Sequence, residues 1–124
     1  MGDKKKILIA EDDPEYLDLL KYALTTAGYA VTACEDGGKA LEAALADRPD
    51  LVLTDVRMPE LDGYHFAQEL GDKYGADCPK IIVMTSRDIE REKGVALLSG
   101  AANIIQKPFK ISLLKEQIEK LLGE

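Results

Sequence analysis

Five short apolar segments recur along the chain, and each is followed by a longer segment in which apolar residues are spaced differently. The apolar segments are residues 7–10, 29–33, 51–54, 80–84 and 102–105. In the longer segments, apolar residues stand three and four positions apart, as Leu17, Leu20 and Leu24 do. Short continuous apolar runs are typical of buried strands, and spacings of three and four are typical of amphipathic helices. The pattern predicts five strands that alternate with five helices.

Residues that begin and end helices stand at the expected boundaries. Asp13 is a typical N-cap, Pro14 suits the first helical position, and Gly28 stands where that helix should end. Ser99-Gly100 ends the fourth helical segment in the same way. Strands that alternate with helices form a parallel sheet covered on both faces and joined by right-handed crossovers. The sequence therefore predicts an α/β, doubly wound fold.

Composition and charge narrow the classes of function. The 124 residues are 46% hydrophobic and 31% charged, which suits a single domain over residues 1–124 with a core of its own. The net charge of −7 argues against nucleic-acid binding by this domain, because neutralising phosphates requires a basic surface. The apolar run at residues 7–10 is too short for a signal peptide or a membrane span, so we expect a cytoplasmic protein without membrane contact.

Polar residues that could carry chemistry stand at the carboxyl ends of the predicted strands. In a doubly wound sheet, ligands bind beyond these ends, where the strand order reverses. Glu35-Asp36 follows the strand that we expect at the edge of the sheet, which is too distant. The four groups that could meet in one cleft are Glu11-Asp12-Asp13, Asp55, Thr85-Ser86 and Lys107-Pro108.

These residue types suit phosphoryl transfer when they are taken together, although each alone has an ordinary explanation as a cap, turn or loop residue. Neighbouring carboxylates raise one another's pKa unless a cation lies between them, and oxygen ligands with room for water suit Mg²⁺. Lysine and threonine supply a positive charge and a hydroxyl donor for phosphoryl oxygens. A remaining carboxylate is free to attack phosphorus and form an aspartyl phosphate.

The order and spacing of the motifs are more specific than any one of them. From Ile7 to Leu122 the chain resembles the response-regulator receiver family of two-component systems. The matching motifs are ILIAEDD (7–13), PDLVLTDVRMP (49–59), LDG (61–63), MTS (84–86) and KPF (107–109). The resemblance implies a flavodoxin-like, five-stranded parallel sheet with strand order 2-1-3-4-5.

The resemblance also implies roles for the strand-end residues. Asp55 would accept the phosphoryl group, and Thr85 and Lys107 would bind its oxygens. Mg²⁺, or Mn²⁺ in its place, would be bound by Asp12, Asp55 and the backbone carbonyl of Arg57.

The position at which the first strand ends determines which two of the three acidic residues bind the metal. Ala10 fills the last buried position of the first strand, so Glu11 and Asp12 correspond to the family's acidic pair, with Glu11 acting through water. Glutamate in the first place departs from the commoner aspartate, and Asp13 stays open as an additional acid.

Further positions bear on switching. The family often has an aromatic residue where this chain has Ile104, and we expect Ile104 to move inward with the threonine in its place. Arg57 stands two residues after the phosphoacceptor, and Arg87 stands two residues after the switch threonine. In the family, residues at these positions tune the lifetime of the phosphoryl group; the alternative is that both are solvated loop arginines. The Lys107-Pro108 peptide bond is predicted to be cis, as in the family.

Partners follow from the same resemblance. The donor would be a sensor histidine kinase or a histidine phosphotransfer protein. A downstream effector, or a second copy of the domain, would bind the face formed by the fourth helix, the fifth strand and the fifth helix. We expect a phosphoacceptor protein and not an enzyme, with no output domain within these residues. The domain would instead assist its own phosphorylation and dephosphorylation.

Two alternatives stay open from the sequence. A small Mg²⁺-dependent phosphatase would also use an aspartyl phosphate, but it would need a general acid where this chain has Arg57. The other alternative is a degenerate receiver that acts only as an interaction module. The presence of Asp55, Thr85 and Lys107 argues against it.

Overall fold

The computed structural model describes residues 4–58 and 60–123, so Pro59 of the 49–59 motif lies outside the described residues. The strands are β1 (Lys6–Ala10), β2 (Ala30–Cys34), β3 (Leu51–Asp55), β4 (Lys80–Thr85) and β5 (Asn103–Gln106). The helices are α1 (Pro14–Thr26), α2 (Gly37–Ala46), α3 (Gly63–Tyr74), α4 (Ile89–Leu98) and α5 (Ile111–Leu122), with a short 3-10 helix η1 (Gly75–Asp77). The predicted alternation of strands and helices is confirmed, with strand ends displaced by one residue at most.

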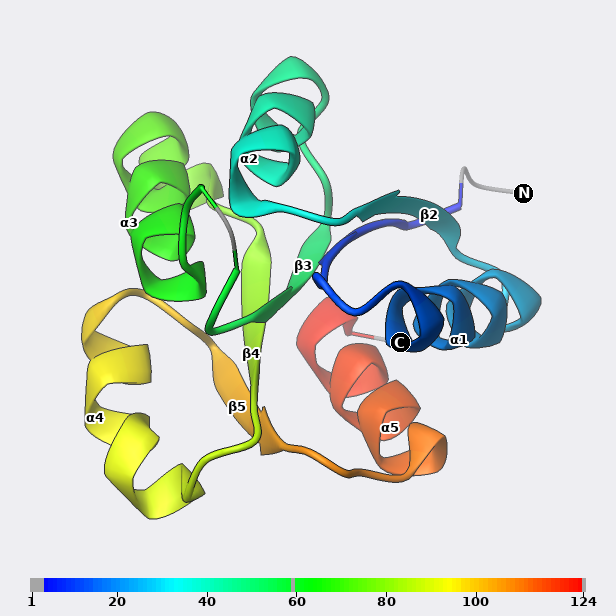
Figure 1. Ribbon diagram of the computed structural model, residues 1–124. Helices are drawn as coiled ribbons and strands as arrows, with labels where there is room; N and C mark the ends of the chain where they lie inside the picture. The colour runs from blue at the N-terminus through cyan, green and yellow to red at the C-terminus, as the bar shows by residue number, and fades with distance from the viewer. Residues whose placement is uncertain (1–3, 59, 124) are drawn as a thin grey trace.

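The strands form one parallel sheet in the order β2-β1-β3-β4-β5, which confirms the predicted topology. Figure 1 shows α1 and α5 on one side of this sheet and α2, α3 and α4 on the other. The chain order reverses between β1 and β3, which pair directly, with Ala10 opposite Thr54. The residues that follow β1 and those that end β3 therefore meet at the same edge.

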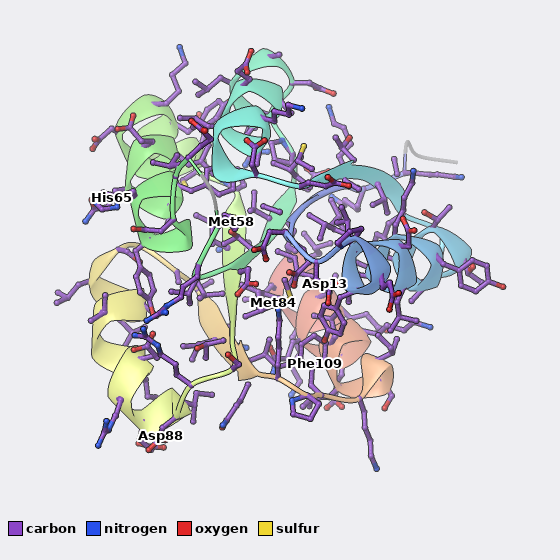
Figure 2. The ribbon with its side chains drawn as sticks, in the orientation of Figure 1. Asp13, Met58, His65, Met84, Asp88 and Phe109 are labelled. Carbon is purple, nitrogen blue, oxygen red and sulfur yellow. The ribbon has the colours of Figure 1, made fainter. Side chains whose placement is uncertain are left out.

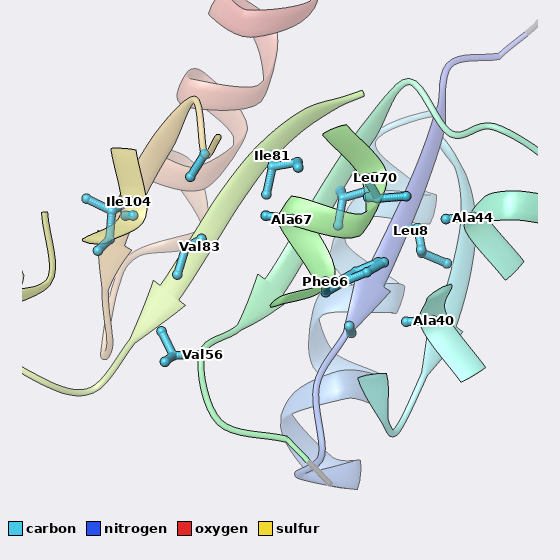
Figure 3. Packing of buried hydrophobic residues seen from close by; sticks show 14 residues of the cluster. Leu8, Ala40, Ala44, Val56, Phe66, Ala67, Leu70, Ile81, Val83 and Ile104 are labelled. Atoms are coloured by element: carbon cyan, nitrogen blue, oxygen red, sulfur yellow. The ribbon is translucent and has the colours of Figure 1, made fainter. Parts of the chain in front are cut away.

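Each face of the sheet buries its own apolar cluster, because successive side chains of a strand point to opposite faces. The cluster under α1 and α5 is built mainly from large aliphatic side chains, and it includes Leu17, Leu20, Leu24, Leu53, Met84 and Leu114. The cluster under α2, α3 and α4 holds many alanines beside larger residues, and Figure 3 shows Ala40, Ala44, Ala67, Val83, Phe66 and Ile104 among them. The two faces thus differ in the size of their buried side chains.

Aspartates begin four of the helices. Asp13 and Asp88 accept hydrogen bonds from backbone N–H groups in the first turns of α1 and α4, where Figure 2 places them. Asp36 and Asp62 cap α2 and α3 in the same way. Gly28 and Gly100 follow the ends of α1 and α4 with φ values of 104° and 100°, a conformation that glycine adopts without strain. Of the helices in the described part of the chain, none combines the length and apolar character that a membrane crossing requires.

Candidate functional site

The carboxyl ends of the central strands open into one polar cleft of about 260 Å³. β1, β3, β4 and β5 each contribute a group there, because parallel strands all end at the same edge of the sheet. The residues that line the cleft are Asp12, Asp55, Val56, Arg57, Thr85, Ser86, Arg87 and Lys107. Residues up to 95 positions apart in the sequence thus face one another.

Three carboxylates gather at this cleft. Glu11, Asp12 and Asp55 each offer an oxygen, and these oxygens lie within 4.8 Å of one another. Glu11 is fully buried, Asp55 is half-buried and Asp12 is exposed. Asp13 is not a member of this group; its carboxylate caps α1 by accepting from the backbone N–H of Glu15 at 3.1 Å.

Lys107 is the cation that faces these acids. Its Nζ donates to Glu11 Oε1 at 2.5 Å and to Asp55 Oδ2 at 3.0 Å. Burial alone would lower the pKa of Lys107, but its hydrogen bonds to the two carboxylates outweigh burial and raise it. The ammonium group therefore stays charged at neutral pH. The Lys107-Pro108 peptide bond is cis, as predicted.

The Glu11 carboxylate is hydrogen-bonded, but it is also buried, and burial disfavours its charged form. Its side chain also accepts from the backbone N–H of Asp13 at 3.1 Å. Burial of the carboxylate, with the nearby charge of Asp55, raises the pKa of Glu11 to about 7 despite these donors. The negative charge concentrated here favours a further cation beside Lys107.

The loop that carries Asp55 depends on a close approach of α3. Gly63 donates its N–H to the carbonyl of Val56 at 2.8 Å. A Cβ atom at position 63 would lie 2.3 Å from the backbone oxygen of Asp55, which no packed structure tolerates. Glycine at this position is therefore required for the path of the backbone beside Asp55.

Thr85 and Arg87 form the opposite wall of the cleft. The Thr85 hydroxyl is buried and accepts from the backbone N–H of Arg87 at 3.0 Å. Ile104 does not line the cleft; it lies on β5 opposite Val83, in the cluster beneath α4. Movement at Thr85 can therefore reach Ile104 only through the packing between them.

Two contacts near the site have no counterpart in the sequence analysis. The ring centroid of Tyr16 lies 4.8 Å from Lys107 Nζ, and the Tyr16 ring meets Phe109 edge to face. The second contact joins Tyr64 of α3 to the buried Glu92 of α4. Neither pair has a fixed spacing in the sequence, so only the folded chain shows them.

Comparison with known proteins gives a consistent result. The family model of the response regulator receiver domain matches residues 7–119. Response regulator MprA of Mycolicibacterium vanbaalenii is 38% identical over 117 residues, which are 94% of this chain and 50% of that protein. The chain thus spans about half the length of this relative.

Solved structures with the same fold include response regulators and receiver domains. The chemotaxis response regulator CheY4 of Vibrio cholerae has a TM-score of 0.90 and 26% identity, over 97% of this chain and 100% of that one. The receiver domain of sensor histidine kinase PA1611 from Pseudomonas aeruginosa PAO1 has a TM-score of 0.88 and 30% identity, over 98% and 100% of the two chains. That structure has a magnesium ion coordinated in its active-site cleft. The topology, the match over residues 7–119 and these relatives agree, and the chain belongs to the response regulator receiver domain family of two-component signalling.

Proposed function

We propose that this domain is a phosphorylation-activated switch that accepts a phosphoryl group on Asp55. The observation that carries the proposal is the placement of Lys107 Nζ 3.0 Å from Asp55 Oδ2, in a cleft that Thr85 also lines. Lys107 already lies where it can bind a phosphoryl oxygen, and its charge offsets the negative charge that the reaction brings. A hydroxyl or an ammonium group alone at a strand end would not supply both a hydroxyl donor and a positive charge for the phosphoryl oxygens.

The acidic cluster fits a divalent cation. Three carboxylate oxygens lie within 4.8 Å of one another, and carboxylate oxygens are ligands of the type that Mg²⁺ and Mn²⁺ prefer. Asp12, Asp55 and the backbone carbonyl of Arg57 would hold the ion, with Glu11 acting through water. When bound, Mg²⁺ would supply positive charge that offsets the carboxylates and the phosphoryl oxygens. The magnesium ion in the PA1611 receiver domain supports this assignment.

The reaction follows from the groups that face Asp55. One Asp55 carboxylate oxygen attacks the phosphorus atom of a phosphohistidine, and the bond from phosphorus to the donor's imidazole nitrogen breaks. The imidazole leaves with the electron pair of that bond. Lys107 and the Thr85 hydroxyl bind the phosphoryl oxygens, so the protein contributes position and charge. Hydrolysis later returns Asp55 to a carboxylate and releases phosphate.

The donor would be a sensor histidine kinase or a histidine phosphotransfer protein. The output face would be α4, β5 and α5, and its partner a downstream effector or a second copy of the domain. Exposed apolar side chains of α4 and α5 support the proposal: Val95 and Leu97 on α4, and Leu113 on α5. Arg57 and Arg87 both line the cleft, which is consistent with an influence on phosphoryl lifetime.

The assignment of Asp55 is tested by incubating the protein with a small phosphodonor and Mg²⁺ and measuring its intact mass. We expect one phosphoryl adduct on the wild-type protein and none on Asp55→Asn. An undiminished adduct on Asp55→Asn would contradict the assignment. Continuous release of phosphate without a persistent adduct would instead favour a phosphatase.

The cation site is tested by titrating Mg²⁺ at several pH values. Because the pKa of Glu11 is about 7, protons compete with the cation below that pH, and Mg²⁺ affinity should rise as the pH rises through 7. Glu11→Gln should remove this pH dependence, and Asp12→Ala should weaken binding at every pH. Equal affinity in the wild-type and Asp12→Ala proteins would exclude Asp12 as a ligand.

A further inference from the structure

The described part of α4 buries an acidic side chain that phosphoryl transfer does not use. Glu92 lies in the first turns of α4 and is 8% exposed. Its Oε1 accepts from the hydroxyl of Tyr64 on α3 at 3.0 Å. An apolar side chain would be cheaper to bury at this position, because a carboxylate loses its hydration there. Glu92 therefore depends on the polar partners that it contacts.

Glu92 connects directly to the wall of the phosphoryl cleft. Its second oxygen, Oε2, lies 3.9 Å from Nη1 of Arg87. Arg87 lines the same cleft as Asp55, and its backbone N–H donates to the hydroxyl of Thr85. The Arg87 side chain is 48% exposed, so it is free to move between partners. Arg87 thus contacts Glu92 and also lines the cleft in which the phosphoryl group would lie.

We propose that Glu92 is a positioning residue that holds Arg87 on α4 in the unphosphorylated domain, and that Arg87 transfers to the phosphoryl group when Asp55 is phosphorylated. This inference rests on the proposed function. A phosphoryl group carries nearly two negative charges and three acceptor oxygens, so it competes well against a single carboxylate for a guanidinium group. No covalent step is involved; one ion pair replaces another.

Tyr64 makes the exchange possible by keeping Glu92 bonded throughout. Burial and the hydrogen bond to Glu92 raise the pKa of Tyr64 to about 12, so its hydroxyl remains a donor at neutral pH. When Arg87 departs, the Glu92 carboxylate retains this donor and is not left buried without a partner. The contact between α3 and α4 through Tyr64 and Glu92 would then persist while the link to the cleft changes.

The test measures the affinity for beryllofluoride, which mimics a phosphoryl group on aspartate, at saturating Mg²⁺. The proteins are wild type, Glu92→Gln, Arg87→Gln and the double variant. Glu92→Gln keeps the shape of the side chain and an acceptor for Tyr64 but removes the charge that holds Arg87. It should bind the mimic about three-fold more tightly than wild type, which is the size of a half-exposed ion pair. In the Arg87→Gln background, the same change should have no effect.

Two further variants sharpen the result. Glu90→Gln removes an exposed charge from the same turn of α4, and it should leave the affinity unchanged. Tyr64→Phe should weaken binding of the mimic, because a carboxylate that loses this donor holds Arg87 more firmly. The opposite signs expected for Glu92→Gln and Tyr64→Phe distinguish the exchange from general loosening of α4, which would give both variants the same sign.

The outcomes separate this inference from the proposed function. If Glu92→Gln changes the affinity equally with and without Arg87, Glu92 acts through the fold or through its overall charge, and the exchange is wrong while the switch stands. If wild-type protein neither binds the mimic nor forms the phosphoryl adduct, the proposed function fails and this inference fails with it. An effect of Glu92→Gln that requires Arg87 supports the exchange.

Discussion

Helices α4 and α5 lie on opposite faces of β5, yet they are held in different ways. α5 buries Leu114 and Ile118 completely within the large aliphatic cluster that it shares with α1. α4 buries only Glu92 and Ala96, and its Leu98 is 87% exposed. Apolar burial therefore fixes α5, whereas α4 depends on Ala96, the half-buried Ile89 and a polar contact.

This difference shows which helix can respond to chemistry at the site. Each large aliphatic side chain contributes about 1.5–3 kcal/mol when it is fully buried, so displacing α5 would be costly. α4 has little apolar area to expose, and it follows Thr85 and Arg87 directly in the chain. A change at the cleft should therefore move α4 more readily than α5.

The largest expected effect is on the free energy of unfolding, which should fall more when a buried side chain of α5 is shortened than when one of α4 is. Leu114→Ala should lower the free energy of unfolding by about 2–5 kcal/mol, since it leaves a cavity in a close-packed cluster. The corresponding change in α4, Ala96→Gly, should cost only about 1 kcal/mol. Denaturant unfolding measures both. Equal losses would mean that α4 is held as firmly as α5.

The next effect concerns the polar contact of α4. Tyr64→Phe removes the hydroxyl that donates to Glu92 and should lower the free energy of unfolding by about 1–2 kcal/mol, because a buried carboxylate loses a donor. Tyr22→Phe is the matched control, since Tyr22 is 73% exposed. It should be neutral in the same unfolding experiment. A neutral Tyr64→Phe would mean that this contact does not hold α4.

Adjacent isoleucines of β5 allow the same substitution on each face. Ile104 lies in the cluster beneath α4, and Ile105 lies in the cluster of α5. Each change to valine should cost about 0.5–1.5 kcal/mol of stability. Only Ile104→Val should also change the affinity for beryllofluoride, because Ile104 is on the face that we expect to switch. An equal change in affinity for Ile105→Val would place the response on both faces.

The smallest effect is a difference in amide chemical shifts with and without beryllofluoride. Shifts should reach Ile104 and the residues of α4, and they should be weaker along α5 from Ile111 to Leu122. Isoleucine is branched at Cβ and stiff about χ1, so a small displacement is expected at Ile104. Changes confined to the loops around Asp55 would exclude α4, β5 and α5 as the output face.

Periodicity and capping residues were sufficient to predict the α/β, doubly wound class of fold. Five apolar runs and helical spacings gave the alternation, and caps gave both ends of the first helix and the end of the fourth, because these signals act over a few residues. The strand order 2-1-3-4-5 came from family resemblance and is confirmed by the sheet. The grouping of the acids at strand ends was predictable because parallel strands end at one edge.

Other features were decided only by the tertiary structure. The sequence predicted that Asp13 caps α1, but it did not predict that the turn after β1 sends Glu11 inward to accept a hydrogen bond directly from Lys107. Tyr64 and Glu92 are 28 residues apart, and no spacing rule joins them. Local patterns report which face of its own element a residue occupies. Contacts between elements depend on how the sheet and helices pack, which is why the shared position of Arg87 between Glu92 and the cleft appears only in the folded chain.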